Sequence, residues 1–371
     1  MNKGNYRLVN SSYSTSDVRI LLQDLEGKVE ILDTAEREKR IQQGTHYSEM
    51  LPLEYKPTDE YMNIYNEALD TLSYETAVAT ALLADKLWKE KGMNLVIVSL
   101  ARAGTPIGIL LRRYIQYKYE FTVPHITISI IRGKGIDVRA MECILDLYGA
   151  KGIQFVDGWV GKGAINKVLQ EAVNDLKIRF KDKYKDIDCL SGELAVLSDP
   201  AYVTELCGTH ADFLIPSACL NATVSGLISR TVKLPSMTDD ELHGAVYYSD
   251  YEDVDKSMEF INKVESYFET LSEDDMHIFD ATISNGNGWA DLMSVQEDYK
   301  VKDINFIKPG VGESTRVLLR RVPHVVLVKS GYNKKYLKHI LRLAEEKNVP
   351  VVEYPLTSYE VIGVIKDVAD I

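Results

Sequence analysis

The chain of 371 residues is too long for one ordinary hydrophobic core, so its length predicts two or three domains. Its 45% hydrophobic residues are typical of a globular protein, and it has neither a secretion signal nor an apolar run of about 20 residues, which excludes a membrane helix and favours the cytoplasm. The net charge of −12 argues against general nucleic-acid binding, and four cysteines without a CxxC pair indicate neither disulfides nor a metal site.

The charge is uneven along the chain. Residues 296–371 hold 13 Lys and Arg against 10 Asp and Glu, a net of +3, which leaves −15 for the remainder. A local RNA-binding role for the C-terminal segment therefore stays open despite the acidic total.

In chain order, residues 1–58 combine a possible helix with a proline-bounded loop and are predicted to form a cap or hood. Residues 59–236 start with a long helical pattern and then alternate apolar runs with amphipathic ones. This alternation predicts a doubly wound, mainly parallel α/β sheet with ligands at the carboxyl ends of its strands. The predicted strands are 94–100, 125–131, 153–156, 193–198 and 212–216, and the predicted helices between them are 106–118, 138–147 and 164–180.

Residues 237–300 are acidic and predict a bridge with one helix near 253–271. Residues 301–371 predict a smaller C-terminal α/β domain of a size that can fold alone. Its expected elements are strand 304–307, helix 313–321, strand 324–329, helix 334–347, strand 349–354 and helix 357–368.

The most informative stretch is IQFVDGWVGKGAI, residues 153–165. A strand pattern ends at Asp157, three glycines follow, and a helix pattern begins at Ala164. Such a loop presents backbone N–H groups to an anion, while the carboxylate can hold ribose hydroxyls. The spacing fits neither a Walker A motif nor GxGxxG, so we expect a phosphorylated sugar or nucleotide rather than an ATPase site.

Two other loops follow predicted strands. In ARAGTP, Arg102 offers fixed donors for phosphate and Gly104 permits close backbone approach, although a helix start with an incidental arginine is the alternative. In IRGKGIDVRA, basic residues around two glycines suggest a mobile lid, and an ordinary solvated loop is the alternative.

The 153–165 loop resembles the ribose-phosphate loop of type I phosphoribosyltransferases, with Gly158 in place of the second acid and Lys162 in place of the threonine. The resemblance implies phosphoribosyl pyrophosphate as substrate, with Mg²⁺, and catalytic roles for Arg102, Asp157 and Lys162. The implied binding residues are those of the pyrophosphate loop, the lid and the phosphate loop: Ala103, Gly104, Thr105, Arg132, Lys134, Gly158, Trp159, Val160, Gly161 and Gly163.

The segment 207–230 supports a different chemistry. Cys207 or Cys219 could act as a nucleophile with His210 as its base, because a thiol near a helix start or an imidazole is readily activated. The alternative is a core thiol, since cysteine is among the most commonly buried residues.

The C-terminal motif KPGVGESTRVLLRR makes a separate prediction. Gly310, Glu313 and Arg316 match the Gly, Glu and Lys/Arg spacing of the kink-turn-binding ribosomal proteins, with Gly312 in place of the usual asparagine. The resemblance implies contacts from a helix N-terminus to structured RNA, while a capped surface helix is the alternative. Further phosphate contacts are expected from Lys308, Arg320 and Arg321.

The order of HYSEMLP, ARAGTP, FVDGWVGKG, LIPSACLNATVSGLISRT and GVGESTRVLLRR resembles one bacterial family of tellurite-resistance and stress operons. Its members are described as phosphoribosyltransferase-like proteins with a Pelota-type RNA-binding domain, and are also labelled the cysteine protease StiP family. We expect phosphoribosyl transfer to or from an unidentified acceptor. The alternatives are a cysteine hydrolase and a non-catalytic, nucleotide-sensing RNA-binding protein, and a homo-oligomer stays open.

Overall fold

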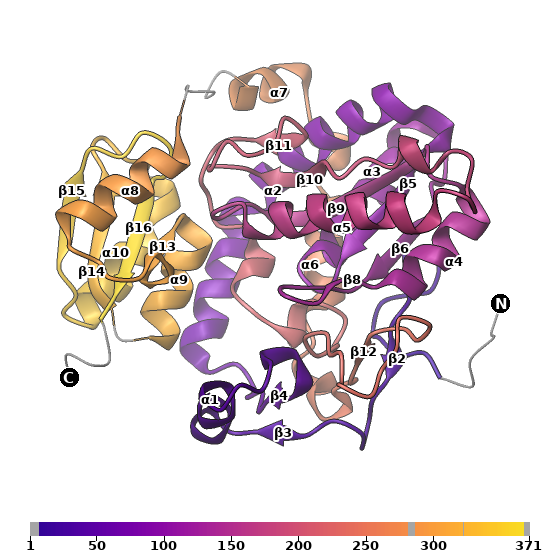
Figure 1. Ribbon diagram of the computed structural model, residues 1–371. Helices are drawn as coiled ribbons and strands as arrows, with labels where there is room; N and C mark the ends of the chain where they lie inside the picture. The colour runs from indigo at the N-terminus through magenta and orange to yellow at the C-terminus, as the bar shows by residue number, and fades with distance from the viewer. Residues whose placement is uncertain (1–6, 281–285, 322, 367–371) are drawn as a thin grey trace.

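A six-stranded parallel sheet forms the centre of the larger domain in the computed structural model, which describes residues 7–280, 286–321 and 323–366 (Figure 1). Every neighbouring pair of its strands runs parallel. This confirms a mixed α/β protein with a mainly parallel sheet, whereas the closer likeness to type I phosphoribosyltransferases stays a prediction. The strand order is β1 (Arg19–Ile20), β6 (His125–Ile128), β5 (Val96–Leu100), β9 (Ile153–Trp159), β10 (Leu194–Ser198) and β11 (Cys207–Thr209).

Helices cover both faces of this sheet, which is why all five residues of β5 and all five of β10 are buried. On one face, α2 (Asp59–Lys91), α3 (Gly104–Tyr119) and α6 (Ser257–Glu265) share a hydrophobic core. On the other face, α4 (Val138–Tyr148) and α5 (Ala164–Phe180) pack in a second core. The carboxyl ends of the strands stay open for a site between these layers.

The N-terminal region forms strand pairs with the larger domain. Beyond the edge strand β1, β2 (Gln23–Asp24) pairs with β12 (Gly244–Ala245), and β3 (Ile31–Leu32) pairs with β4 (Leu51–Pro52). Helix α1 (Thr34–Gln42) lies between β3 and β4, and the Asp33 carboxylate caps it by accepting from the Glu36 N–H. A short hairpin, β7 (Ile130–Ile131) with β8 (Gly135–Ile136), replaces the open loop expected there.

The predicted strand 212–216 is wrong, because β11 occupies the sheet edge instead. Phe213, Leu214 and Ile215 are buried without a ladder partner, in the core between the two domains. The Phe213 ring contacts Tyr336 of the C-terminal domain, with centroids 5.9 Å apart. The apolar run at 212–216 therefore indicated a buried segment correctly, but it did not indicate a strand.

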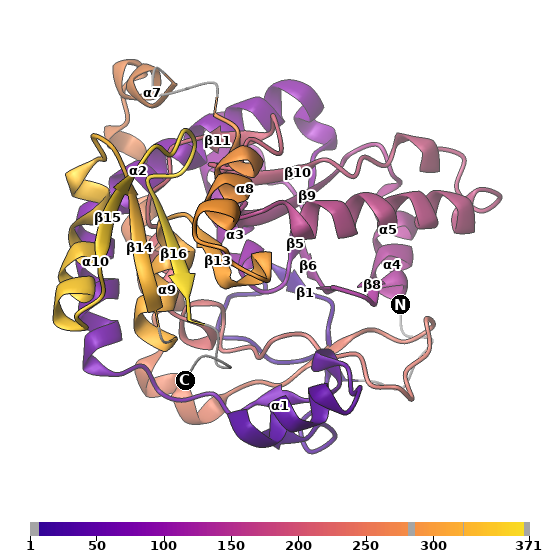
Figure 2. The ribbon, with the colours of Figure 1, turned by 60° about the vertical axis from the view of Figure 1, so that its left-hand side comes forward.

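The C-terminal domain has a four-stranded sheet in the order β13 (Ile307–Pro309), β16 (Val361–Ile365), β14 (Pro323–Lys329) and β15 (Val351–Tyr354). Helix α8 (Gly288–Asp298) covers one face, and α9 (Val311–Arg320) and α10 (Lys334–Glu346) cover the other (Figure 2). The predicted helix 357–368 is wrong. Its β-branched VIGVI run forms β16, which is antiparallel to both of its neighbours.

The segment between the domains contains more than the single helix predicted at 253–271. It begins with β12 and the 3₁₀ turn η6 (Ser249–Val254), and continues with α6, which packs against α2 and α3, and with α7 (Glu273–Asp280). Among the residues that the structure describes, no helix is both long enough and apolar enough to cross a membrane.

Candidate functional site

A thiol and an imidazole meet at the open edge of the parallel sheet. Cys207 begins β11 and His210 follows its end, with Cys207 Sγ 3.5 Å from His210 Nε2. His210 Nδ1 lies 2.7 Å from the backbone oxygen of Asp199. Sγ also lies 3.9 Å from Nδ1, so the sulfur is beside the ring and not on the axis of the Nε2 lone pair. Because a carbonyl oxygen only accepts hydrogen bonds, Nδ1 carries the proton of the neutral ring, and Nε2 is the nitrogen that can take the thiol proton.

Asp199 holds the loop that surrounds this pair. Its buried carboxylate accepts from the N–H groups of Val203 at 2.6 Å and Thr204 at 2.7 Å, and from that of Ala201 at 3.1 Å. Burial raises the pKa of this carboxyl group above its usual value, and the three N–H donors oppose that rise. Asp199 therefore fixes the loop with its side chain and the imidazole with its backbone.

Tyr202 completes the arrangement. Its ring stacks on the His210 ring with centroids 4.1 Å apart and an interplanar angle of 3°. Sequence reasoning missed both Asp199 and Tyr202, although Asp199 directly follows a predicted strand at its carboxyl end. That position was the signal that could have identified it.

His210 also lines a cavity of about 560 Å³ beside α5. Tyr202 and the next three residues form one wall, and Gln170, Asn174 and Lys177 of α5 contribute to another. Cys207 itself is 1% exposed and lies in the core that α4 and α5 share. The imidazole is thus in contact with the cavity on one side and with the thiol on the other.

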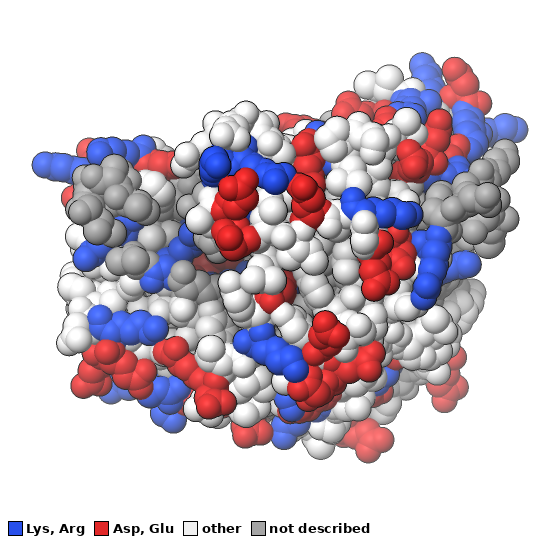
Figure 3. Space-filling view, turned by 90° about the horizontal axis from the view of Figure 1, so that it is seen from below, with Lys and Arg blue, Asp and Glu red and all other residues white. Residues whose placement is uncertain are grey.

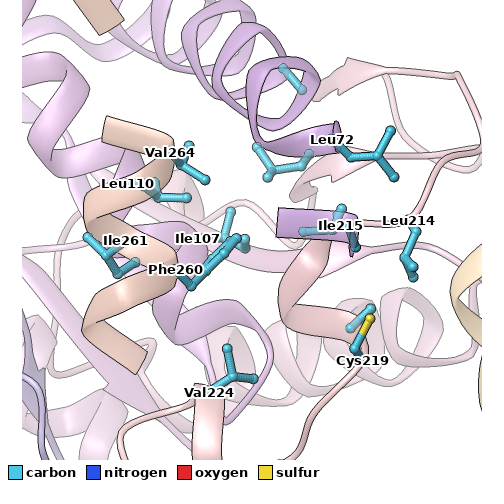
Figure 4. Packing of buried hydrophobic residues seen from close by; sticks show 14 of the residues in the cluster. Leu72, Ile107, Leu110, Leu214, Ile215, Cys219, Val224, Phe260, Ile261 and Val264 are labelled. Atoms are coloured by element: carbon cyan, nitrogen blue, oxygen red, sulfur yellow. The ribbon is translucent and has the colours of Figure 1, made fainter. Parts of the chain in front are cut away.

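Cys219 has different surroundings. It follows the short 3₁₀ turn η4 (Pro216–Ala218), is 1% exposed, and belongs to the core that α2, α3 and α6 share. Figure 4 shows its sulfur in the same apolar cluster as Leu214 and Ile215.

The loop predicted to bind phosphate lies against the C-terminal domain. Lys162 Nζ donates to the Ile304 backbone oxygen at 2.6 Å, and Tyr359 Oη donates to the Gly161 oxygen at 2.7 Å. Gly163, with φ of +78°, leads into α5. Burial lowers the pKa of Lys162 to about 8, with the nearby Lys308 contributing.

Asp157 lies inside β9, which continues two residues beyond the predicted strand end to Trp159, and its carboxylate accepts from the Gly158 N–H at 2.8 Å. Burial raises the pKa of this carboxyl group to about 7. The structure brings Asp157, Trp159, Val160, Gly161, Lys162 and Gly163 around one cavity of about 300 Å³. Ala103 and Arg132 also line it.

The other predicted anion-binding residues are spread out. Arg102 Nη1 donates to the Ile228 oxygen at 3.2 Å and lies 3.5 Å from Glu54 Oε2. The Thr105 hydroxyl is buried beside that of Thr127, and Lys134 pairs with Glu49 at 3.2 Å. Gly104 allows a close approach, because a Cβ there would lie 2.4 Å from the Val156 oxygen.

The motif predicted to contact RNA faces the larger domain. Val311 N–H, which follows Gly310 at the start of α9, donates to Asp212 Oδ1 at 2.8 Å. Arg316 Nε donates to the Ala218 oxygen at 3.0 Å, and its guanidinium lies 5.1 Å from the Trp159 ring centroid. Arg316 and Glu313 also face the cavity that Lys308 lines, and Gly312 lies beside Trp159. Arg321 is exposed, and the side chain of Arg320 lies outside the described residues.

Comparisons with known proteins divide the chain at the same place as the fold. The family model described as "Tellurite-like stress resistance cysteine protease StiP" matches residues 11–265, and the PELOTA RNA-binding domain model matches residues 286–367. The protein named cysteine protease StiP from Acinetobacter baylyi is 33% identical, over 96% of this chain and 94% of its own length.

A solved structure from Clostridium difficile, described as a phosphosugar isomerase, covers 81% of this chain and 69% of its own at 12% identity. Its TM-score of 0.22 is too low to carry any argument.

The expectation of phosphoribosyl transfer is wrong, because the family model and the relative are both named for a cysteine protease. The Mg²⁺ expectation depended on phosphoribosyl pyrophosphate and stays a prediction. Since the family model spans more than half of the chain and the relative matches it almost end to end, the chain belongs to the StiP family of tellurite-like stress resistance cysteine proteases.

Proposed function

We propose that this protein is a cysteine protease in which Cys207 is the nucleophile and His210 is the general base. The observation that carries the proposal is the contact of 3.5 Å between Cys207 Sγ and His210 Nε2, with Nδ1 anchored on the Asp199 oxygen. A nucleophile in contact with a base that a third group orients is the arrangement common to covalent hydrolases.

The geometry supports a two-step hydrolysis. Nε2 takes the thiol proton as Sγ attacks the scissile carbonyl carbon, and the imidazolium then gives that proton to the departing amine. This breaks the C–N bond and leaves a thioester. Nε2 next accepts a proton from water, the hydroxyl attacks the thioester carbon, and the thiol leaves with the proton. The anchored Nδ1–H keeps Nε2 as the unprotonated nitrogen, and a turn of the ring aims its lone pair at the sulfur.

Substrate would approach from the cavity that His210 lines. Because Cys207 is buried and is not part of the lining of this cavity, the residues around it have to move before the peptide reaches the sulfur. Tyr202 is the ring that such a movement displaces from His210.

Hydrolysis of fluorescein-labelled casein tests the assignment. Wild-type protein should release labelled peptides and lose this activity with iodoacetamide, whereas Cys207→Ser should be inactive from the start. The matched control is Cys219→Ala, which removes an equally buried thiol. Cleavage that survives in Cys207→Ser but disappears in Cys219→Ala would overturn the assignment.

A second function, RNA binding, is favoured by the PELOTA model over residues 286–367 and by the basic excess of the C-terminal segment. Fluorescence anisotropy with labelled RNA tests it, and affinity should fall steeply as salt rises. Absence of binding at low salt would reject it. The likeness of the larger domain to type I phosphoribosyltransferases remains a prediction about fold alone.

A further inference from the structure

Two adjacent cavities lie at the boundary between the domains. The first, of about 300 Å³, lies between the 157–166 segment and α9, and the second, of about 350 Å³, lies beside the start of α3. Ala103 and Arg316 line both cavities. We call the two adjacent cavities together the interdomain cleft, and both domains contribute to its walls.

The interdomain cleft is basic in a protein whose net charge is −12. The acidic residues that line it are Asp157 and Glu313. The basic residues that line it are Arg102, Arg132, Lys162, Arg230, Lys308 and Arg316. By contrast, Lys and Arg alternate with Asp and Glu on the outer face in Figure 3.

Arg230 is the clearest sign that an anion belongs in this cleft. Burial lowers its pKa to about 10, and Arg102 and Arg37 lower it further by repulsion. The guanidinium lies over the Tyr47 ring, 5.7 Å from the centroid, and no carboxylate among the described residues forms an ion pair with it. The nearby Glu54 carboxylate offsets part of this repulsion, and a bound anion would offset more of the cost of a half-buried charge that forms no ion pair within the described ranges.

At the other end of the cleft, burial lowers the pKa of Lys308 as well as that of Lys162. The two ammonium groups repel one another, while Glu313 and Asp303 attract both. The buried hydroxyl of Tyr248, which Glu54, Arg102 and Arg230 influence electrostatically, has no hydrogen-bond partner among the residues that the structure describes. The Tyr248 hydroxyl near Arg230 is therefore a polar group to which a ligand could hydrogen-bond.

We propose that single-stranded RNA binds in the interdomain cleft, with phosphates on Arg102 and Arg230 of the larger domain as well as on Arg316 of the C-terminal domain. The inference rests on the RNA-binding function proposed above. Because the motif at 310–316 faces the cleft, a strand that contacts this motif also meets the larger domain.

Two features favour a strand over a small anion. The cleft consists of two adjacent cavities that share Ala103 and Arg316, so basic side chains follow one another over more than the space of a single phosphate group. Trp159 and Tyr47 each lie under a guanidinium, and aromatic rings among basic side chains are the usual elements of single-strand grooves.

The test uses anisotropy of a fluorescein-labelled ten-nucleotide RNA with the full chain. Arg230→Gln should weaken binding about tenfold, because a charge-assisted contact to phosphate is lost. It should also reduce the slope of log affinity against log salt by about 0.7, the value for one phosphate on a single strand. Arg230→Lys should retain most of the affinity. The control is Arg179→Gln, which removes an exposed charge on α5 that pairs with Asp239.

The outcomes separate the two proposals. No binding by wild-type protein at low salt would overturn both the RNA-binding function and the cleft. Binding that Arg316→Gln weakens but Arg230→Gln leaves unchanged would overturn the cleft alone and confine RNA to the C-terminal domain. Displacement of the RNA by micromolar inorganic phosphate or pyrophosphate would show a free-anion site and overturn the RNA assignment. Circular dichroism of each variant confirms that the fold is retained.

Discussion

Two regions of the larger domain contain a buried cysteine, and they differ in what touches the sulfur. Cys207 and Cys219 are both 1% exposed. Cys207 has an imidazole nitrogen 3.5 Å away, whereas Cys219 lies in an apolar core (Figure 4).

Burial is the same for the proposed nucleophile and for Cys219, so it cannot be the basis for choosing between them. The choice of Cys207 rests on its contact with an imidazole whose protonation is set by a further contact, the hydrogen bond from His210 Nδ1 to the Asp199 oxygen. Cys219 fills space, so its substitution should act on stability and leave the chemistry intact.

The largest effect that can break this comparison is the loss of the nucleophile. Cys207→Ala should reduce casein hydrolysis by up to about 10⁶-fold, because no other group can form the thioester. Cys219→Ala should keep activity and cost about 1 kcal/mol of unfolding free energy through lost packing. Initial rates of casein hydrolysis measure the activity, and urea unfolding measures the free energy of unfolding. Equal loss of activity in both variants would remove the distinction.

The next largest effect concerns the base. His210→Ala should lower the rate by about 10²- to 10⁴-fold, the range typical of a general acid–base group. His324→Ala is the matched control, since His324 is exposed on β14 of the C-terminal domain. The measurement is kcat on labelled casein. A rate within twofold of wild type for His210→Ala would rule out its role as base.

A smaller effect is expected from Asp199→Ala. The substitution leaves three loop N–H groups without their carboxylate acceptor, so unfolding free energy should fall by about 3 kcal/mol. Because Asp199 acts through His210, kcat should fall more than KM rises. Thermal melts and steady-state kinetics check both, and unchanged kinetics would make Asp199 purely structural.

The smallest effect concerns Asp212, which lies between the two cysteine regions and binds the start of α9. Burial raises the pKa of its carboxyl group from 3.8 to about 7, so folding takes up a proton between these values. Its contribution to stability is therefore fully present below about pH 4 and is lost as pH rises to about 7. In Asp212→Asn the side chain cannot ionise, so this pH dependence is absent. The difference in melting temperature, wild type minus Asp212→Asn, should therefore decrease from pH 4 to pH 8. A difference independent of pH would contradict the raised pKa.

Much of the fold could be predicted because periodicity and chain alternation fix it. Predicted helix 164–180 matches α5 at both ends, and the predicted strands 94–100 and 193–198 match β5 and β10 within two residues. The predicted strand 304–307 is mostly the 3₁₀ turn η8 (Ile304–Phe306), and two further wrong elements, 212–216 and 357–368, are apolar segments whose partners are distant in sequence. Asp212 and Phe213 contact the C-terminal domain, and β16 needs β13 and β14 on either side.

The candidate site was less predictable for the same reason. Spacing placed Cys207 and His210 three residues apart but could not show that the ring turns back toward the sulfur. Nor could it show that a backbone carbonyl orients the imidazole, because carbonyls have no sequence signature. The motif at 310–316 was visible in the sequence, yet its orientation toward the larger domain follows from tertiary contacts such as that of Arg316 with the Ala218 oxygen.

The most direct test of the central claim is the alkylation rate of each cysteine by iodoacetamide at pH 6, followed by peptide mapping with mass spectrometry. Ordinary thiols are almost fully protonated at this pH and react slowly. Cys207 should be alkylated first, in step with the loss of protease activity, and its rate should fall to that of Cys219 in His210→Ala. Inactivation that follows modification of Cys219, with Cys207 unmodified, would contradict the account.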